Sequence, residues 1–210
     1  MNSDQRKEIV EVAHKLSHGR TGNLSVRVDE GFLITPTGVA NDDLKQDQIV
    51  FMNMDGESQR DQLKPSSEWR FHRDLYENRQ DVHSIIHTHS TYATVLACHQ
   101  KEIPPFHYMI AEAGGDTIRC ADYATFGTQQ LSDNIIVAMK DRKACLMANH
   151  GMLVVGENIK KALDLSEQVE ELARQYVLAL QIGSPVILSS QEMAINIEKF
   201  KHYGKQNDQS

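Results

Sequence analysis

Three absences in the sequence each exclude a class of protein. No run of 18 apolar residues occurs, so no transmembrane helix is expected. The stretch MNSDQRKEIVEVAHKL is charged throughout and lacks the apolar core of a signal peptide. Basic residues are not in excess, since 22 Lys and Arg stand against 29 Asp and Glu. The net charge of −7 argues against nucleic acid as the main partner, because phosphate backbones are bound by basic surfaces.

Cysteine is also scarce, and no pair has CxxC spacing. The three residues Cys98, Cys120 and Cys145 are far apart and odd in number, which predicts reduced thiols in a cytoplasmic protein. No internal repeat, low-complexity segment or Pro/Gly-rich linker divides the 210 residues. We therefore expect one domain over residues 1–210, with a mobile C-terminal tail from about residue 205.

Hydrophobic periodicity predicts alternating helices and strands. The expected helices cover residues 4–17, a stretch starting near Ser66, residues 90–100, 128–141 and 158–182, and a last helix from Ser189 to near Gly204. Thr128 is the expected N-cap of the fourth, Gly183 ends the fifth, and Ser189-x-x-Glu192 forms a capping box for the last. The expected strands are GNLSVRV, GFLITPTG, QIVFMNMDG, HSIIHTH, KACLMANHG and MLVVG. This order predicts an α/β fold around a central, largely antiparallel sheet.

The strand SIIHTH ends in two histidines, which are poor choices for a hydrophobic core. Side chains at i and i+2 of a strand share a face, so His87 and His89 project together. A third histidine, His150, stands where another apolar strand meets a Gly turn. Three imidazoles at two strand ends match a zinc site with an open fourth position. The alternative is an unrelated surface pair plus a turn histidine. We read the other seven as surface or packing residues: His14, His18, His72, His83, His99, His107 and His202.

Several motifs in a fixed order resemble the zinc-dependent class II aldolases that act on sugar phosphates. They are GNLSVRV, ITPTG, KPSSEWRFH, HTH, HYMIAEAGGDTIRCADYATFGT and ANHGMLVVG, and they lie between about Gly19 and Gly204. The resemblance implies a three-layer α/β/α fold and a homotetramer with active sites between subunits. It also implies zinc-dependent, reversible cleavage of a ketose 1-phosphate to dihydroxyacetone phosphate and a short aldehyde. The expected substrate is L-fuculose 1-phosphate, which would release L-lactaldehyde. The alternative is a similar ketose phosphate, such as a 5-deoxypentulose phosphate, which would release acetaldehyde.

The same resemblance assigns roles to individual residues. His87, His89 and His150 would be the zinc ligands, with one Zn²⁺ per subunit. Glu68 would be the catalytic acid/base, and a further metal contact when no substrate is bound. Tyr108 would reach into a neighbour's site as a proton donor. The residues expected to bind substrate are Gly22, Asn23, Thr37, Gly38, Ser66 and Ser67 for the phosphate, and Phe126, Phe200 and Tyr203 around the aldehyde.

The chemistry of these residues agrees with those roles. Retro-aldol cleavage develops an enediolate, and without a Schiff-base lysine that charge needs a Lewis acid. Glu68 is the one carboxylate tied to the site by motif, so it is the candidate base. Short polar side chains at two turns and a predicted helix start suit a phosphate when taken together. Each feature alone is also ordinary: turn chemistry, a first-turn carboxylate, or a core tyrosine with a bonded hydroxyl.

Three alternatives share this fold. L-Ribulose-5-phosphate 4-epimerases carry a similar HTHSTYAT stretch, but they typically have Asp where this chain has Glu68. Methylthioribulose-1-phosphate dehydratases would use the same metal and base to lose water. A non-catalytic module like the adducin head lacks the metal ligands, all of which are present here. The tail after Gly204 departs from the family, which leaves open the contacts that close over the aldehyde.

Overall fold

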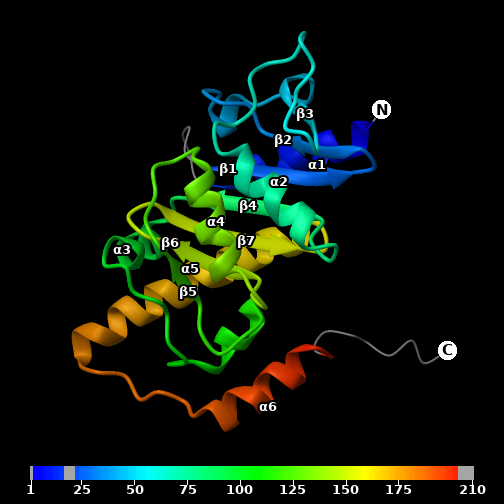
Figure 1. Cartoon of the computed structure of the whole chain (residues 1–210). Helices are drawn as coiled ribbons and strands as arrows, with labels where there is room; N and C mark the ends of the chain where they lie inside the picture. Colours follow the sequence, from blue (N-terminus) through cyan, green and yellow to red (C-terminus); the bar gives the residue numbers. More distant parts are fainter. Residues whose placement is uncertain (1, 17–21, 203–210) are drawn as a thin grey trace, which may run out of the picture.

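The computed structural model describes residues 2–16 and 22–202, and it is built on a seven-stranded sheet (Figure 1). The strands are ordered β3-β2-β1-β4-β7-β6-β5 across the sheet. Their bounds are β1 Asn23–Val28, β2 Gly31–Ile34, β3 Val50–Asn53, β4 Ser84–Thr88, β5 Arg119–Ala121, β6 Ala144–Met147 and β7 Gly151–Gly156. Neighbours are antiparallel, except that β5 and β6 run parallel. The prediction of a largely antiparallel sheet is therefore confirmed.

Six α-helices accompany the sheet within the described residues. They are α1 Ser3–Ala13, α2 Trp69–Asn78, α3 Thr91–Cys98, α4 Gln129–Ala138, α5 Ile159–Ile182 and α6 Ser190–Phe200. Three short 3-10 helices cover Asn41–Asp43, Gln46–Gln48 and Tyr108–Ala113. The predicted caps are confirmed: Thr128 accepts from the Leu131 amide, Gly183 ends α5, and Ser189 forms the capping box with Glu192.

Each face of the sheet buries its own hydrophobic core, which gives the expected three layers (Figure 1). On one face α1, α3 and α5 pack against strand residues that include Leu24 and Ile86. On the other, α2 and α4 pack against residues that include Phe32 and Ile85. Adjacent residues on β4 thus serve opposite cores, as the period of a strand requires. The helix α6 packs beside the 3-10 helix at Tyr108–Ala113 rather than on the sheet.

The helix α2 starts later than the sequence predicts. Its first residue is Trp69, with Glu68 at the N-cap position, instead of a residue near Ser66. The reason is a local strand-like contact: the Ser66 amide donates to Thr35 O, and Pro36 and Pro65 form a bridge. This contact keeps residues 65–66 extended against the loop after β2. Glu68 therefore lies at the junction between that extended segment and the helix.

Two further observations concern membranes and thiols. Among the helices that the structure describes, none is long and apolar enough to cross a membrane. All three cysteines are free thiols, with Cys145 buried, Cys120 half-buried and Cys98 exposed. The expected tail from about residue 205 lies outside the described residues.

Candidate metal centre and active site

The three histidines predicted as metal ligands meet at one end of the sheet. One nitrogen from each of His87, His89 and His150 lies within 4.8 Å of the others. The Nε2 atoms of His87 and His89 are 3.0 Å apart. The three rings contact one another edge to face, with centroids 4.8–4.9 Å apart. A metal ion is bound by neutral imidazole in this kind of cluster, so the arrangement fits the predicted site.

The sheet brings these histidines together from distant parts of the chain. His87 is the fourth residue of β4, His89 follows the end of that strand, and His150 lies in the tight turn between β6 and β7. Because β7 pairs with β4, its first residue, Gly151, lies against the strand end. A Cβ added at Gly151 would be 2.4 Å from Thr88 O and 3.0 Å from His89 Cδ2, so only glycine fits. Asn149, with φ +54°, makes the turn that aims His150 inward.

Glu68 adds a carboxylate to this cluster. Its Oε2 lies 3.4 Å from Nε2 of His87, and its Oε1 lies 3.4 Å from Nε2 of His150. The side chain is buried, and its Oε2 accepts a hydrogen bond from Nδ2 of Asn23 at 2.9 Å. Its Oε1 is buried without any hydrogen-bond partner. A buried carboxylate oxygen without a partner is costly, and a cation between Glu68 and the imidazoles would satisfy it.

The imidazoles are electrostatically suited to hold a cation because burial keeps them neutral. Desolvation, and then the proximity of His89, lowers the pKa of His87 to about 3. Desolvation, and then the proximity of His87, lowers the pKa of His150 to about 4. Burial also lowers the pKa of His89. Nδ1 of His87 donates to Met152 O at 2.8 Å, which leaves its Nε2 lone pair facing the cluster. The residues present therefore fit a divalent metal.

A cavity of about 370 Å³ opens beside the cluster, and it collects most of the predicted substrate residues. Its walls include Glu68, His89 and His150, together with every residue predicted to bind phosphate: Gly22, Asn23, Thr37, Gly38, Ser66 and Ser67. These residues come from three separate segments, at Gly22-Asn23, Thr37-Gly38 and Ser66-Ser67. The hydrogen bond from Thr37 N to Lys64 O joins the second segment to the third, and the Gly22 backbone packs on His87 O. Gly22 has φ +87°, and a Cβ there would lie 2.4 Å from His87 O. Phe126 is 65% exposed and lines the rim.

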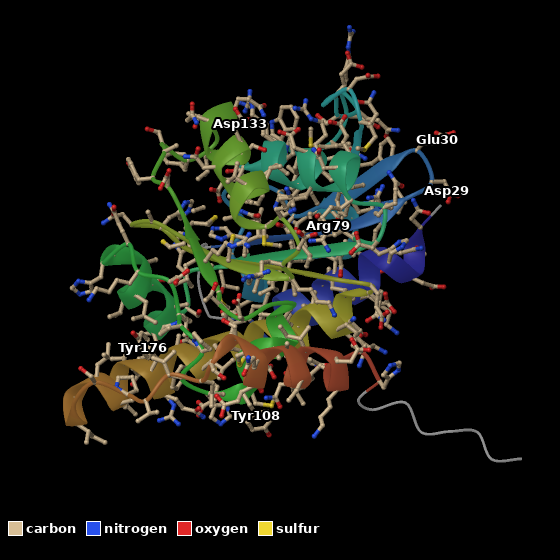
Figure 2. All side chains as sticks on the ribbon, turned by 60° about the horizontal axis from the view of Figure 1, so that its bottom comes forward. Asp29, Glu30, Arg79, Tyr108, Asp133 and Tyr176 are labelled. Carbon is tan, nitrogen blue, oxygen red and sulfur yellow. The ribbon has the colours of Figure 1, made fainter. Side chains whose placement is uncertain are left out.

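Two predicted residues do not line this cavity, and a third lies outside the described residues. Tyr108 is 47% exposed and lies on the side of the molecule formed by α5 and α6 (Figure 2). Its ring stacks on that of Phe200 with centroids 6.4 Å apart, so these two residues contact each other away from the cavity. Tyr203 lies outside the described residues. The single chain therefore brings together the metal and phosphate residues but leaves Tyr108 and Phe200 elsewhere.

His72, which the sequence places among surface or packing histidines, is a packing residue in this region, and its hydrogen bond to Asn23 was not predicted. The structure buries His72 completely and links its Nε2 to Oδ1 of Asn23 at 2.5 Å. The spacing offered a signal, since His72 follows Glu68 by four residues and therefore shares its helix face. Tyr123 and Asn149 also line the cavity without having been predicted.

Comparison with known proteins agrees with this geometry. Residues 9–177 match the family model for the Class II Aldolase and Adducin N-terminal domain. The chain is 52% identical to the 5-methylthioribulose-1-phosphate/5-deoxyribulose-1-phosphate aldolase of Rhodospirillum rubrum, over 90% of this chain and 85% of that protein. It is 46% identical to the L-fuculose phosphate aldolase of Escherichia coli K12, over 90% of this chain and 88% of that protein.

The fold of this chain also matches that of a solved relative. A solved structure of an L-fuculose 1-phosphate aldolase superposes with a TM-score of 0.92 at 42% identity, covering 96% of this chain and 98% of the other. The relatives are named as aldolases, and the cluster of three histidines could hold a metal ion. The chain therefore belongs to the class II aldolase family, whose enzymes are metal-dependent lyases.

Proposed function

We propose that the protein uses zinc to cleave a ketose 1-phosphate reversibly into dihydroxyacetone phosphate and a short aldehyde. The observation that carries this proposal is the pairing of three neutral imidazoles with a buried carboxylate, at the wall of a cavity that has three polar turns. L-Fuculose 1-phosphate is the first expected substrate, supported by the likeness to enzymes named for it.

The metal ligands in this proposal are His87, His89 and His150, with Glu68 as a further contact when no substrate is present. Zinc bound there would act as a Lewis acid that offsets the negative charge of the enediolate oxygens. The Nδ1–H of His87 donates to Met152 O and so fixes the ring with Nε2 toward the centre. Zinc suits the set because imidazole and carboxylate are both among its usual ligands.

Glu68 is the proposed acid/base. In the direction of synthesis, a carboxylate oxygen removes a proton from the hydroxymethyl carbon of dihydroxyacetone phosphate, and in cleavage the same carboxyl returns it. Its Oε1 has no partner, while Oε2 is held by Asn23, so one oxygen is fixed and the other is available. The general acid/base role is typically worth about 10²–10⁴-fold in rate.

The phosphate is placed among the turns that carry Gly22-Asn23, Thr37-Gly38 and Ser66-Ser67. These residues line the same cavity as Glu68, and Ser66-Ser67 come just before the N-terminus of α2, where a helix favours an anion. Gly38 supports this role because φ is +76° and nothing lies within 4 Å of an added Cβ, so its backbone faces open space. The metal centre at the other wall would then hold the carbonyl end of the substrate.

The proposed assembly is a homotetramer with active sites between subunits. Tyr108 supports it, because this half-exposed residue lies away from its own cavity and would serve a neighbour's. The apolar side chains of Ile182, Val186 and Ile195 also support it, since they are 93%, 87% and 59% exposed in the single chain. A second copy of the chain would bury them, with Phe200 and Tyr203 closing near the aldehyde.

A second substrate class is favoured by sequence identity. The Rhodospirillum rubrum relative, at 52%, is named for 5-methylthioribulose 1-phosphate and 5-deoxyribulose 1-phosphate. These sugars would yield the same dihydroxyacetone phosphate and a shorter or sulfur-bearing aldehyde. The aromatic rim of Tyr123 and Phe126 is compatible with an apolar aldehyde from any of the three ketose phosphates.

The test is the release of dihydroxyacetone phosphate, measured by a coupled dehydrogenase assay. The zinc-loaded protein is given L-fuculose 1-phosphate, 5-deoxyribulose 1-phosphate and 5-methylthioribulose 1-phosphate in parallel. Release from at least one is expected, and the ranking of kcat/KM identifies the aldehyde. No release from any, with epimerisation of L-ribulose 5-phosphate instead, would replace the proposal with a 4-epimerase. Loss of water from 5-methylthioribulose 1-phosphate would indicate a dehydratase.

We also infer that the protein works in the cytoplasm. The support is chemical: all three cysteines are free, and thiols persist in reducing compartments. Cell fractionation with an antibody to the protein tests this inference, and recovery outside the cytoplasmic fraction would contradict it.

A further inference from the structure

A row of polar side chains joins the buried face of α2 to the strand β1. Glu68, His72 and Tyr76 are spaced four residues apart, so they form one stripe along the helix. Asn23 and Ser25 are spaced two apart on β1, so they share one face of the strand. All five side chains are buried, and three of them, Ser25, His72 and Tyr76, are completely inaccessible. Polar groups that are buried away from water are generally hydrogen-bonded, and here the partners are the other members of the row.

The hydrogen bonds of this row are continuous. The Tyr76 hydroxyl lies 2.7 Å from Ser25 Oγ, and Ser25 Oγ lies 2.7 Å from His72 Nδ1. His72 Nε2 lies 2.5 Å from Asn23 Oδ1. Asn23 Nδ2 then donates to Glu68 Oε2 at 2.9 Å. We call these five residues the α2–β1 chain.

The direction of every hydrogen bond follows from the ionised carboxylate at one end. A carboxylate only accepts, so Asn23 presents its NH₂ group to Glu68 and its oxygen to His72. His72 must then donate from Nε2, and as a neutral imidazole it accepts at Nδ1 from Ser25. Ser25 in turn accepts from Tyr76. The opposite ring tautomer would aim the Asn23 oxygen at the carboxylate, with two acceptors in contact.

We propose that His72 is a positioning residue for the aldolase reaction, acting through Asn23 on Glu68. Its Nε2–H fixes the Asn23 amide with the NH₂ group toward the carboxylate. That amide holds Oε2, which lies 3.4 Å from Nε2 of His87, and it leaves Oε1, which lies 3.4 Å from Nε2 of His150, without a hydrogen-bond partner. This inference rests on the proposed function, because the group that is positioned is the proposed acid/base.

Other buried polar groups on α2 behave differently, which sets the α2–β1 chain apart. Asp74 accepts hydrogen bonds from Ser132 and Gln129, both on α4, so this cluster joins two helices and stops there. Among the described residues, no side-chain hydrogen bond of Asp74, Ser132 or Gln129 goes to a residue of the cavity wall. The α2–β1 chain instead ends on a carboxylate that lines the cavity. Ser132 therefore provides a control whose loss affects the packing of α4 against α2 without reaching Glu68.

The test compares two substitutions of similar length and shape at one position. His72→Gln keeps an N–H donor for Asn23, whereas His72→Met removes it. The rates measured are cleavage and the exchange of a dihydroxyacetone phosphate carbon proton for solvent deuterium, which isolates the step assigned to Glu68. His72→Met is expected to lower kcat and the exchange rate by about 10–100-fold, the usual loss when a partner behind a functional group is removed. KM stays near the wild-type value, and His72→Gln recovers most of the rate.

Ser132→Ala is the matched control and is expected to lower stability while leaving both rates unchanged. Equal rates for His72→Met and His72→Gln would overturn the proposal, as would a drop for Ser132→Ala of the same size as that for His72→Met. A wild-type protein that shows neither cleavage nor exchange would instead contradict the proposed function. The tautomer is tested separately by nitrogen NMR of ¹⁵N-histidine-labelled protein. An Nε2–H, Nδ1-acceptor ring at His72 supports the chain, and an Nδ1–H ring overturns it.

Discussion

Asn23 holds Glu68 by one oxygen only: its Nδ2 donates to Oε2 at 2.9 Å, and Oε1 of the same carboxylate has no hydrogen-bond partner. A carboxylate that is fixed at one oxygen and free at the other is oriented and still able to act. The free oxygen lies 3.4 Å from Nε2 of His150, at the wall of the cavity. This relationship links the metal centre to the proton chemistry, and the predictions below test each part of it.

Replacing His89 with Ala is expected to remove the metal and abolish turnover. The variant loses one of the three imidazoles that now lie within 4.8 Å of one another, and it keeps one ligand fewer than the wild-type set of three imidazoles and Glu68. The metal content of the purified variant is measured together with cleavage. His83→Ala is the control, because His83 is exposed and outside the cluster. Retention of about one zinc per chain by the His89 variant would remove it from the ligand set.

Replacing Glu68 with Gln is expected to preserve the metal but to cost about 10²–10⁴-fold in kcat, the usual range for a general acid/base. The amide has the shape of the carboxyl group but cannot accept a proton from carbon. Glu77→Gln is the matched control, since Glu77 is exposed on the same helix α2. An unchanged kcat in the Glu68 variant would exclude this residue from the mechanism.

Replacing Tyr108 with Phe is expected to slow cleavage while the fold survives, because only an exposed hydroxyl is lost. Tyr176→Phe is the control, since its ring packs against Phe106 in the same layer (Figure 2). A mixture of Tyr108→Phe and Glu68→Gln chains, unfolded and refolded together, is expected to regain activity. Recovery requires that one chain supplies Tyr108 to a site whose Glu68 comes from another. Full activity of the Tyr108 variant alone would show a purely structural tyrosine.

Acid is expected to destabilise the metal-free protein. The folded pKa values of His87 and His150, about 3 and about 4, are below the usual value near 6.5 of an unfolded chain. The unfolded state therefore binds more protons, and stability is lost as pH falls from about 6.5 toward the folded values. Each imidazole contributes up to about 2 kcal/mol of this loss by pH 5.

Urea unfolding of the chelated protein at pH 7 and pH 5 checks this expectation. His150→Gln is expected to show a smaller loss between the two pH values than the wild type, whereas His83→Gln, at an exposed position, follows the wild type. The same loss in wild type and His150→Gln would mean that His150 is not kept neutral by the fold.

The sequence predicted the meeting of His87, His89 and His150 because its signals are local and periodic. The i, i+2 spacing of His87 and His89 places both side chains on one face of any strand. His150 precedes Gly151, where the close approach of β7 to the end of β4 leaves no room for a side chain. The caps at Thr128 and Ser189 are equally local, and the structure confirms them. Chain order alone gave no strand pairing, so the meeting of β4 with β7 depended on resemblance to a family.

Tertiary contacts account for what the sequence did not reveal. The start of α2 was predicted near Ser66, but the hydrogen bond from Ser66 N to Thr35 O delays the helix to Trp69. The strand β5 is three residues long and was not predicted, since it depends on pairing with β6. The hydrogen bond between His72 and Asn23 was not predicted because the two residues are distant in sequence, although the spacing of His72 from Glu68 marks one helix face.

A zinc titration of the metal-free protein, with release of dihydroxyacetone phosphate as the readout, tests the metal dependence directly. We expect no release before zinc is added, and a linear rise that ends at one equivalent per chain. Glu68→Gln should bind the same single equivalent and stay slow. Release that is undiminished by chelation, or that does not follow zinc occupancy, would contradict a reaction built on His87, His89, His150 and Glu68.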